Sequence, residues 1–251
     1  MDGDGRPTLA GLFRECQQAV VLTGAGVSTE SGLSDFRSRT GLWQKIDPIK
    51  AASIRAWRSD PHQFFQFYRQ RLRRLEGAEP NPAHRALALL EKRGYIDVLI
   101  TQNVDGLHQR AGSEDIVEVH GNLRQAECLT CNGVFGSEAL LGGGGDVPRC
   151  EVCDSVLKPR VVLFGEVLPE APWQRAVEAV MDTDLLLVVG SSLQVSPVNA
   201  LPIHAVRNGA RLAIINLEPT PYDGQAALVC QEEAGSCLTR LIRELELDSP
   251  L

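Results

Sequence analysis

The stretch GAGVSTESGLSDFR (residues 24–37) directly follows the apolar run AVVLT (residues 19–23). An apolar strand that leads into a glycine-rich turn is typical of nucleotide-binding α/β proteins, whose backbone N–H groups approach phosphate at such a turn. The dinucleotide fingerprint of dehydrogenases is G-x-G-x-x-G, but Thr29 occupies its third position here. No strand with a terminal acidic residue follows. The turn therefore predicts a diphosphate site and argues against a hydride-transfer enzyme.

Five more short apolar runs lie further along the chain, at residues 95–101, 116–119, 161–164, 184–189 and 211–215. Near-continuous apolar runs are typical of strands that are buried on both faces, as in a parallel sheet between helices. Helical patterns lie between several of them, at 81–94 and 172–183, and Thr8 is placed to cap a first helix. The pattern predicts an α/β fold with a doubly wound, Rossmann-like parallel sheet.

Composition and charge restrict the class of protein. The 251 residues are 43% hydrophobic and 23% charged, which is ordinary for a globular protein. The formal net charge of −7 argues against a partner bound mainly through phosphate, so we expect no direct nucleic-acid binding. No run approaches the roughly 20 apolar residues that span a bilayer, and the acidic start is unlike a signal peptide. We therefore expect a cytoplasmic protein with reduced thiols and no membrane partner.

Four of the seven cysteines have the spacing of a zinc ribbon, C-x2-C-x18-C-x2-C: Cys128, Cys131, Cys150 and Cys153. Four thiolates form a closed tetrahedral site, which predicts one structural Zn²⁺ ion per chain. The alternative, two redox-active pairs, lacks a thioredoxin-like context. Cys16, Cys230 and Cys237 remain, and each is expected to be a packing residue.

Each predicted strand is followed by small or polar residues, such as Gln102 and Asn103 after the second run and His120 after the third. Ligands of open α/β sheets bind at the carboxyl ends of the strands, so these residues are expected to meet in one site.

Seven motifs, in this order, resemble those of the sirtuins, the NAD-dependent protein lysine deacylases, of the bacterial type. They are GAGVSTESGLSDFR (24–37), TQNVDGLHQRAG (101–112), VHGNL (119–123), the paired Cys-x-x-Cys motifs, KPRVVLFGE (158–166), GSSLQVSPVNAL (190–201) and INLEPTP (215–221). The resemblance implies a single catalytic domain over residues 8–245, between flexible ends at 1–7 and 246–251. Its parts are expected to be a Rossmann-like core at about 8–37, 93–121 and 161–245, a helical module at about 38–92 and a zinc module, with a flexible connector at Gly142–Gly145, at about 122–160.

In the sirtuins NAD is consumed as a co-substrate. The acyl oxygen of an acylated protein lysine attacks C1′ of the nicotinamide ribose, nicotinamide leaves, and the acyl group ends on ADP-ribose. By resemblance, His120 is the base that deprotonates a ribose hydroxyl, and Asn103 is the second catalytic residue. An imidazole with a pKa near 6.5 suits proton removal near neutral pH. His62, His84, His108 and His204 are expected to serve packing or the surface.

The resemblance also implies the residues that contact NAD. Phe36 would shield C1′ from water after nicotinamide departs, and Arg37 would lie near the phosphates and ribose. The alternative for Asp35 and Arg37 is a surface ion pair. The implied NAD-binding residues are Gly24, Ala25, Gly26, Thr29, Asp35, Phe36, Arg37, Gln102, Asn103, Val104, Asp105, His120, Gly190, Ser191, Ser192, Asn216, Leu217 and Glu218.

The acylated peptide is implied to bind as a strand between two segments of the chain. The residues concerned are Val162, Phe164, Gly165, Glu166, Leu193 and Val195. Tyr68 and Arg71 resemble the pair with which succinyl-selective sirtuins bind the acyl carboxylate, so desuccinylase or demalonylase activity is a further expectation. The alternative is that Tyr68 packs in the core and Arg71 is solvated.

Three other functions fit part of the pattern. A protein mono-ADP-ribosyltransferase could use the same fold and the same NAD site. A zinc-ribbon binding module would lack catalysis, and the complete set of polar strand ends argues against it. An NAD-dependent oxidoreductase is disfavoured by the missing third glycine.

Overall fold

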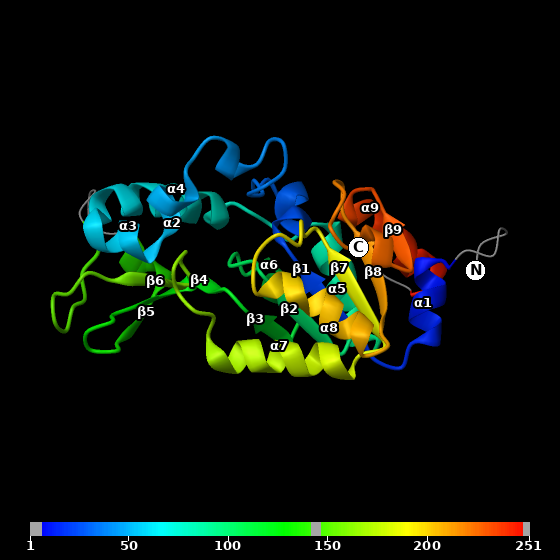
Figure 1. Cartoon of the computed structure of the whole chain (residues 1–251). Coiled ribbons are helices and arrows are strands. Elements are labelled where there is room, and N and C mark those ends of the chain that lie inside the picture. The colour runs from blue at the N-terminus through cyan, green and yellow to red at the C-terminus, as the bar shows by residue number, and fades with distance from the viewer. Residues whose placement is uncertain (1–6, 142–146, 248–251) are drawn as a thin grey trace.

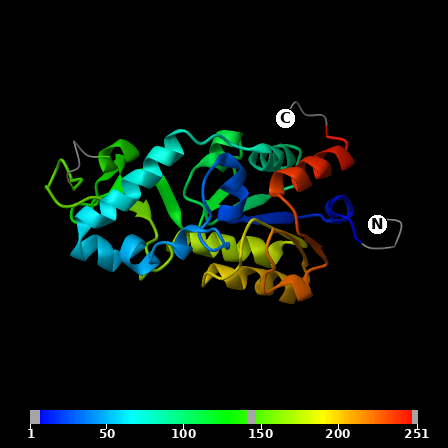
Figure 2. The same ribbon diagram turned by 90° about the horizontal axis from the view of Figure 1, so that it is seen from above.

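The structure is a computed structural model that describes residues 7–141 and 147–247. The expected connector at Gly142–Gly145 and nearly all of the expected flexible ends lie outside these residues. The described chain forms two lobes, which both views separate along the length of the molecule (Figures 1 and 2). Among the described helices, none combines the length and the hydropathy needed to cross a membrane.

The larger lobe is built on a six-stranded parallel sheet with the order β3-β2-β1-β7-β8-β9. Its strands are β1 (Ala19–Thr23), β2 (Val98–Thr101), β3 (Ile116–Glu118), β7 (Leu185–Val189), β8 (Arg211–Ile215) and β9 (Leu228–Cys230). β1, β2, β7 and β8 are buried almost throughout, which explains why they read as continuous apolar runs. The predicted doubly wound α/β fold is confirmed.

Alternate side chains of the strands enter two separate cores. Val21 and Leu187 pack on one face with α1 (Leu9–Glu15), α5 (Pro82–Lys92) and α9 (Ala234–Glu244). Val20 and Leu186 pack on the opposite face with α7 (Glu170–Asp182) and α8 (Leu201–Arg207). Short α6 (Leu107–Ala111) lies at the carboxyl end of β2. Both figures show helices on the two faces of the sheet.

The smaller lobe joins the helical and cysteine-rich segments in one core. Its helices are α2 (Pro48–Ala52), α3 (Ile54–Ser59) and α4 (Pro61–Glu76), and its antiparallel sheet holds β4 (Gly121–Glu127), β5 (Val134–Gly136) and β6 (Lys158–Val161) in the order β5-β4-β6. Phe64 and Phe65 of α4 are completely buried against this sheet. The 3-10 turns of the chain are η1 (Ala25–Ser31), η2 (Leu42–Gln44), η3 (Ser137–Leu140), η4 (Val198–Ala200) and η5 (Asp223–Gln225).

Helix boundaries follow the capping signals. Thr8 Oγ1 accepts a hydrogen bond from the Gly11 N–H at the start of α1, as expected. The packing of α5 against α9 places that helix with the parallel sheet, although the sequence groups it with the helical module at 38–92.

One strand prediction was wrong, and one strand was not predicted. The run 161–164 is not a strand of the parallel sheet, since Val161 ends β6 and Phe164 only bridges to Ser53. The sixth parallel strand is instead β9, which is three residues long and only half buried. An apolar run reports burial but not the strand with which it pairs, and a short, half-buried strand leaves a weak apolar signal.

Candidate active site

The glycine turns after β1 and β7 pack against each other at the point where the strand order reverses. The Gly24 N–H donates to Val189 O (3.0 Å) and the Gly26 N–H donates to Gly190 O (2.8 Å). A Cβ on Gly26 would lie 2.8 Å from Gly190 Cα, and Gly190 itself has a φ of +62°. These glycines therefore permit contact between two backbones at the topological switch point, where ligands of open α/β sheets bind.

A chain of hydrogen bonds connects this turn with His120. The Gln102 side-chain amide donates to Ser191 Oγ (2.9 Å), and the Gln102 carbonyl lies 3.1 Å from His120 Nδ1. Because a carbonyl only accepts hydrogen bonds, the Nδ1 atom carries the proton and Nε2 is left as the acceptor of a neutral imidazole. The His120 carbonyl in turn accepts from the Val162 N–H (2.9 Å).

Two influences lower the pKa of His120. Burial is the larger of the two, and the positive charge of Arg37 adds to it. The hydrogen bond to the Gln102 carbonyl acts in the other direction, because it favours the protonated ring. The imidazole therefore stays neutral to lower pH than a free histidine. A neutral ring with a bare Nε2 atom can accept a proton.

Asn103 and Asp105 meet on the hydroxyl of Ser28. The Asn103 side-chain amide donates to Ser28 Oγ (3.1 Å) and to Gly24 O (3.2 Å). Ser28 Oγ donates to Asp105 Oδ2 (2.9 Å), and the Leu107 N–H holds Oδ1 (2.9 Å). Burial raises the pKa of Asp105. Ser28 is absent from the residues expected in the site, because nothing in the glycine-rich turn shows which side chains approach its hydroxyl.

His84 and His108 form a buried pair behind this network, with ring centroids 4.8 Å apart. His108 Nε2 lies 3.0 Å from Thr23 Oγ1, and His84 Nδ1 accepts a hydrogen bond from the Asn81 N–H (3.3 Å). Burial lowers the pKa of His84 to about 4. The two rings pack beneath the site.

The segment Asp35-Phe36-Arg37 lies against the smaller lobe. Asp35 Oδ1 accepts from the Ser38 N–H (2.9 Å), and Phe36 stacks on Trp43 with ring centroids 5.0 Å apart. Arg37 is half buried, and its positive charge helps to lower the pKa of His120. Among the described residues no ion pair joins Asp35 to Arg37, so the surface-pair alternative is not what the structure shows.

The remaining residues expected to bind NAD line the carboxyl ends of β1, β2, β7 and β8. The Asn216 side-chain amide donates a hydrogen bond to the Glu218 carbonyl (2.6 Å). Leu217 between them is 60% exposed. Thr29 Oγ1 bonds back to Gly26 O (2.8 Å). Three residues of the set remain. Ala25 begins η1, and the Val104 carbonyl accepts a hydrogen bond from the Leu123 N–H (3.0 Å). Ser192 lies between buried Ser191 and Leu193.

Both segments expected to hold a peptide adjoin the network around His120. The first segment starts at Val162, and its Phe164 already pairs through its backbone with Ala52 and Ile54. Glu166 Oε2 accepts from the Leu163 N–H (2.8 Å) and lies 3.2 Å from the buried Lys158 ammonium, while Gly165 is exposed. In the second segment the Leu193 N–H donates to Ser191 Oγ (3.3 Å), and the Val195 carbonyl accepts from Asn199 (2.8 Å).

Tyr68 and Arg71 differ in their surroundings. Tyr68 is buried and stacks on Phe64, with centroids 4.4 Å apart, as the core-packing alternative expects. Arg71 is not solvated like its neighbours: its guanidinium lies 4.7 Å from the centroid of Phe36, and burial lowers its pKa. Tyr68 and Asp105 act against burial and raise the pKa of Arg71. Arg71 therefore faces the site.

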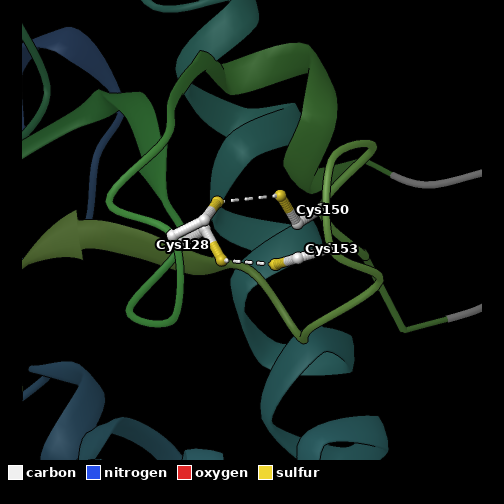
Figure 3. A group of neighbouring side chains, drawn as sticks. Cys128, Cys150 and Cys153 are labelled. Carbon is white, nitrogen blue, oxygen red and sulfur yellow. Dashed lines mark hydrogen bonds between the residues drawn. The ribbon is translucent and has the colours of Figure 1, made fainter.

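The four spaced cysteines meet at one point of the smaller lobe. Cys128 Sγ lies 3.4 Å from Cys153 Sγ (Figure 3). Cys131 Sγ lies 3.6 Å from Cys150 Sγ. All four sulfurs lie within 4.8 Å of one another. A tetrahedral zinc ion with bonds of about 2.3 Å needs sulfurs roughly 3.8 Å apart, so the cluster fits that ion. The Cys131 N–H lowers the pKa of Cys128 to about 6, which favours a thiolate ligand.

Together the fold and the site define a nucleotide-binding α/β protein with a four-cysteine cluster in its smaller lobe. The model of the Sir2 family matches residues 24–197. An NAD-dependent protein deacetylase from Geobacillus kaustophilus is 48% identical over 240 residues, which cover 95% of this chain and 98% of that protein. An NAD-dependent protein deacylase from Archaeoglobus fulgidus is 42% identical, with 94% of each chain covered. The chain belongs to the Sir2 family.

Solved structures agree with this assignment. A Sir2 protein bound to a deacetylated p53 peptide and 3′-O-acetyl ADP-ribose superposes with a TM-score of 0.90 at 38% identity, covering 94% of this chain and 96% of that one. A Sir2 complex with a p53 peptide and NAD⁺ has a TM-score of 0.86 at 37% identity, covering 94% and 97%.

Proposed function

We propose that the protein is an NAD-dependent protein lysine deacetylase that transfers the acyl group of acyl-lysine to ADP-ribose and releases nicotinamide. The observation that carries the proposal is the continuous hydrogen-bonded path from Ser191 through Gln102 and His120 to Val162. This path joins the turn suited to diphosphate to a segment suited to an acylated peptide. The names of two relatives, a deacetylase at 48% identity and a deacylase at 42% identity, support this activity.

His120 is assigned as the general base. Its Nδ1 proton is fixed on the Gln102 carbonyl, so Nε2 is the atom that takes a proton from a ribose hydroxyl of NAD. Asn103 and Asp105 hold the nicotinamide end through the amide and carboxylate that Ser28 orients. Phe36 covers the reacting carbon and excludes water, because water would compete with the acyl oxygen.

The four-cysteine cluster is assigned to one structural Zn²⁺ ion, which would supply folding free energy and no catalytic water because all four positions are taken by sulfur. A peptide between Val162–Glu166 and Leu193–Val195 would bind mainly through its backbone. The cytoplasmic location expected from the sequence stays a prediction.

The test of this function is incubation with NAD and an acetyl-lysine peptide. Deacetylated peptide and free nicotinamide should form together and neither should form without NAD. Nicotinamide release with labelled protein and an intact acetyl group would instead identify an ADP-ribosyltransferase. If NAD is not consumed with any of several acyl peptides, the noncatalytic binding module is the interpretation that remains.

The pH profile gives a sharper check on His120. Since burial and Arg37 both lower the pKa of this base, kcat should fall only below the usual histidine pKa. Arg37→Met removes a positive charge, so the pKa of His120 rises and the acidic limb of kcat moves to higher pH. Profiles measured at saturating NAD should show this shift, while Arg39→Met, at an exposed neighbour, should leave the limb in place. An unmoved limb in both variants would contradict the assigned base.

A second acyl preference is favoured by one observation. Among the described residues Arg71 has no ion-pair partner, yet it is partly buried and its guanidinium lies against the Phe36 ring. A succinyl or malonyl carboxylate would supply the missing partner through charge-assisted hydrogen bonds.

Arg71→Met is therefore expected to lower kcat/KM for a succinyl-lysine peptide by about 10- to 100-fold, the value of one charged hydrogen-bonded contact. Turnover of the acetyl-lysine peptide should change much less. Arg73→Met is the matched control, because Arg73 lies on the same helix and is exposed. Equal effects of Arg71→Met on both peptides would contradict a role of Arg71 in binding the acyl carboxylate.

A further inference from the structure

Two cysteines outside the zinc cluster lie next to each other at the carboxyl edge of the parallel sheet. Cys230 ends β9, and Cys237 lies in α9. Their Sγ atoms and a carboxylate oxygen of Glu232 all lie within 4.8 Å of one another. Both cysteines are reduced in the structure. We propose that Cys230 and Cys237 form a reversible disulfide when the protein meets a hydroperoxide, and that this bond weakens NAD binding.

The charge around the pair disfavours a metal ion as the alternative. Arg240 pairs with both carboxylate oxygens of Glu232, through Nη1 (2.9 Å) and Nη2. The same guanidinium donates to Cys237 Sγ (3.6 Å). A divalent cation would have to displace the Arg240 guanidinium from Glu232 and Cys237, which are two of the three side chains that could bind the ion. The positive charge of Arg240 instead favours the thiolate form of the neighbouring Cys230.

The two thiols have complementary environments. Cys230 is partly exposed, and the adjacent Cys237 thiol lowers its pKa, which favours the reactive thiolate. Cys237 is buried, and its neighbour and its burial raise its pKa. Cys230 is thus the thiol that a small oxidant can reach, and Cys237 is the thiol placed to resolve it.

The chemistry balances with hydrogen peroxide as the oxidant. The Cys230 thiolate attacks one peroxide oxygen, the O–O bond breaks, and the leaving hydroxide takes a proton to become water. Cys237 sulfur then attacks the sulfenic sulfur, the S–O bond breaks, and the second water leaves with the Cys237 proton. Both sulfurs are oxidised, and the peroxide is reduced to two waters. A dithiol such as dithiothreitol reverses the reaction by exchange.

The location of the pair connects it with the site described above. The Cys230 carbonyl accepts from the Asn216 N–H (3.1 Å), which follows β8. The Gly235 N–H donates to Glu30 Oε1 (2.8 Å) in η1, the turn that follows the first glycines. Residues 230–235 therefore contact two segments of the expected NAD site, η1 and the end of β8. A disulfide draws the sulfurs to about 2.05 Å and so moves β9 against α9.

Peptide mapping tests the disulfide directly. Protein treated with hydrogen peroxide is alkylated and digested with trypsin, which leaves both cysteines in the peptide that follows Arg211 and ends at Arg240. Cleavage after Glu232 or Glu233 then separates the two cysteines unless a disulfide joins them. The cross-linked product should appear after peroxide and disappear after dithiothreitol. Its absence, while other cysteines of the same sample are oxidised, would overturn the proposal.

Kinetics test the effect on NAD, which rests on the proposed function. Peroxide should raise the KM for NAD of the wild type severalfold with little change in kcat, and Cys230→Ser and Cys237→Ser should each resist the change. Zinc content, measured in parallel, should stay at one ion per chain. A second zinc ion that Cys230→Ser removes would instead show a metal site and contradict the disulfide. Because mapping needs no turnover, an inactive protein with the cross-link would refute the deacetylase and not the disulfide.

Discussion

His120→Ala is expected to lower the deacetylation rate about a thousandfold, the usual contribution of a positioned general base. The variant loses the imidazole whose Nε2 atom is free to accept the proton of the ribose hydroxyl, since the Gln102 carbonyl holds Nδ1. NAD binding should be nearly unchanged, because the glycine turns and the Ser28 network do not involve the ring. Rates at saturating substrates and titration calorimetry with NAD separate the two effects.

His204→Ala is the control, since this side chain is exposed on α8 and should have no effect. Near-normal turnover in His120→Ala would show that another group takes the proton. Loss of NAD affinity in proportion to turnover would show that the ring serves binding only.

Cys150→Ser is expected to abolish zinc binding and to destabilise the smaller lobe by more than about 3 kcal/mol, a part of the roughly 10 kcal/mol that zinc contributes to small modules. Cys150 is buried in the core shared with α4, so the loss reaches Phe64 and Leu157 as well. Activity should fall as a consequence, because β6 leads directly into the peptide segment at Val162.

Metal analysis, thermal unfolding and turnover measure these three effects together. Cys16→Ser should keep the zinc, since this cysteine lies in the larger lobe. A protein that loses its metal but keeps both its melting temperature and its turnover would contradict the structural role of the cluster.

The parts of the fold that the sequence predicts well are those buried on both faces. The runs at 19–23, 184–189 and 211–215 match β1, β7 and β8 within one residue, because nearly every side chain of these strands is buried. The cysteine cluster is equally readable, since metal geometry fixes the spacing of its ligands. Each of these features is determined by a local pattern.

The features that the sequence could not predict depend on contacts between distant segments. Val161 carries the same apolar signal as a parallel strand, but its partner β4 places it in the smaller sheet. Ser28 reads as one small residue in a loop until Asn103 and Asp105 approach it from the second strand. Arg71 resembles its solvated neighbours until Phe36 covers its guanidinium. Sequence spacing carries no information on such approaches.

The central claim is that NAD is consumed as the acceptor of the acyl group, and product stoichiometry tests it most directly. Nicotinamide, deacetylated peptide and O-acetyl-ADP-ribose should form in equal amounts from NAD and an acetyl-lysine peptide, with His120→Ala as the blank. Free acetate formed without O-acetyl-ADP-ribose, or deacetylation without nicotinamide release, would contradict the claim.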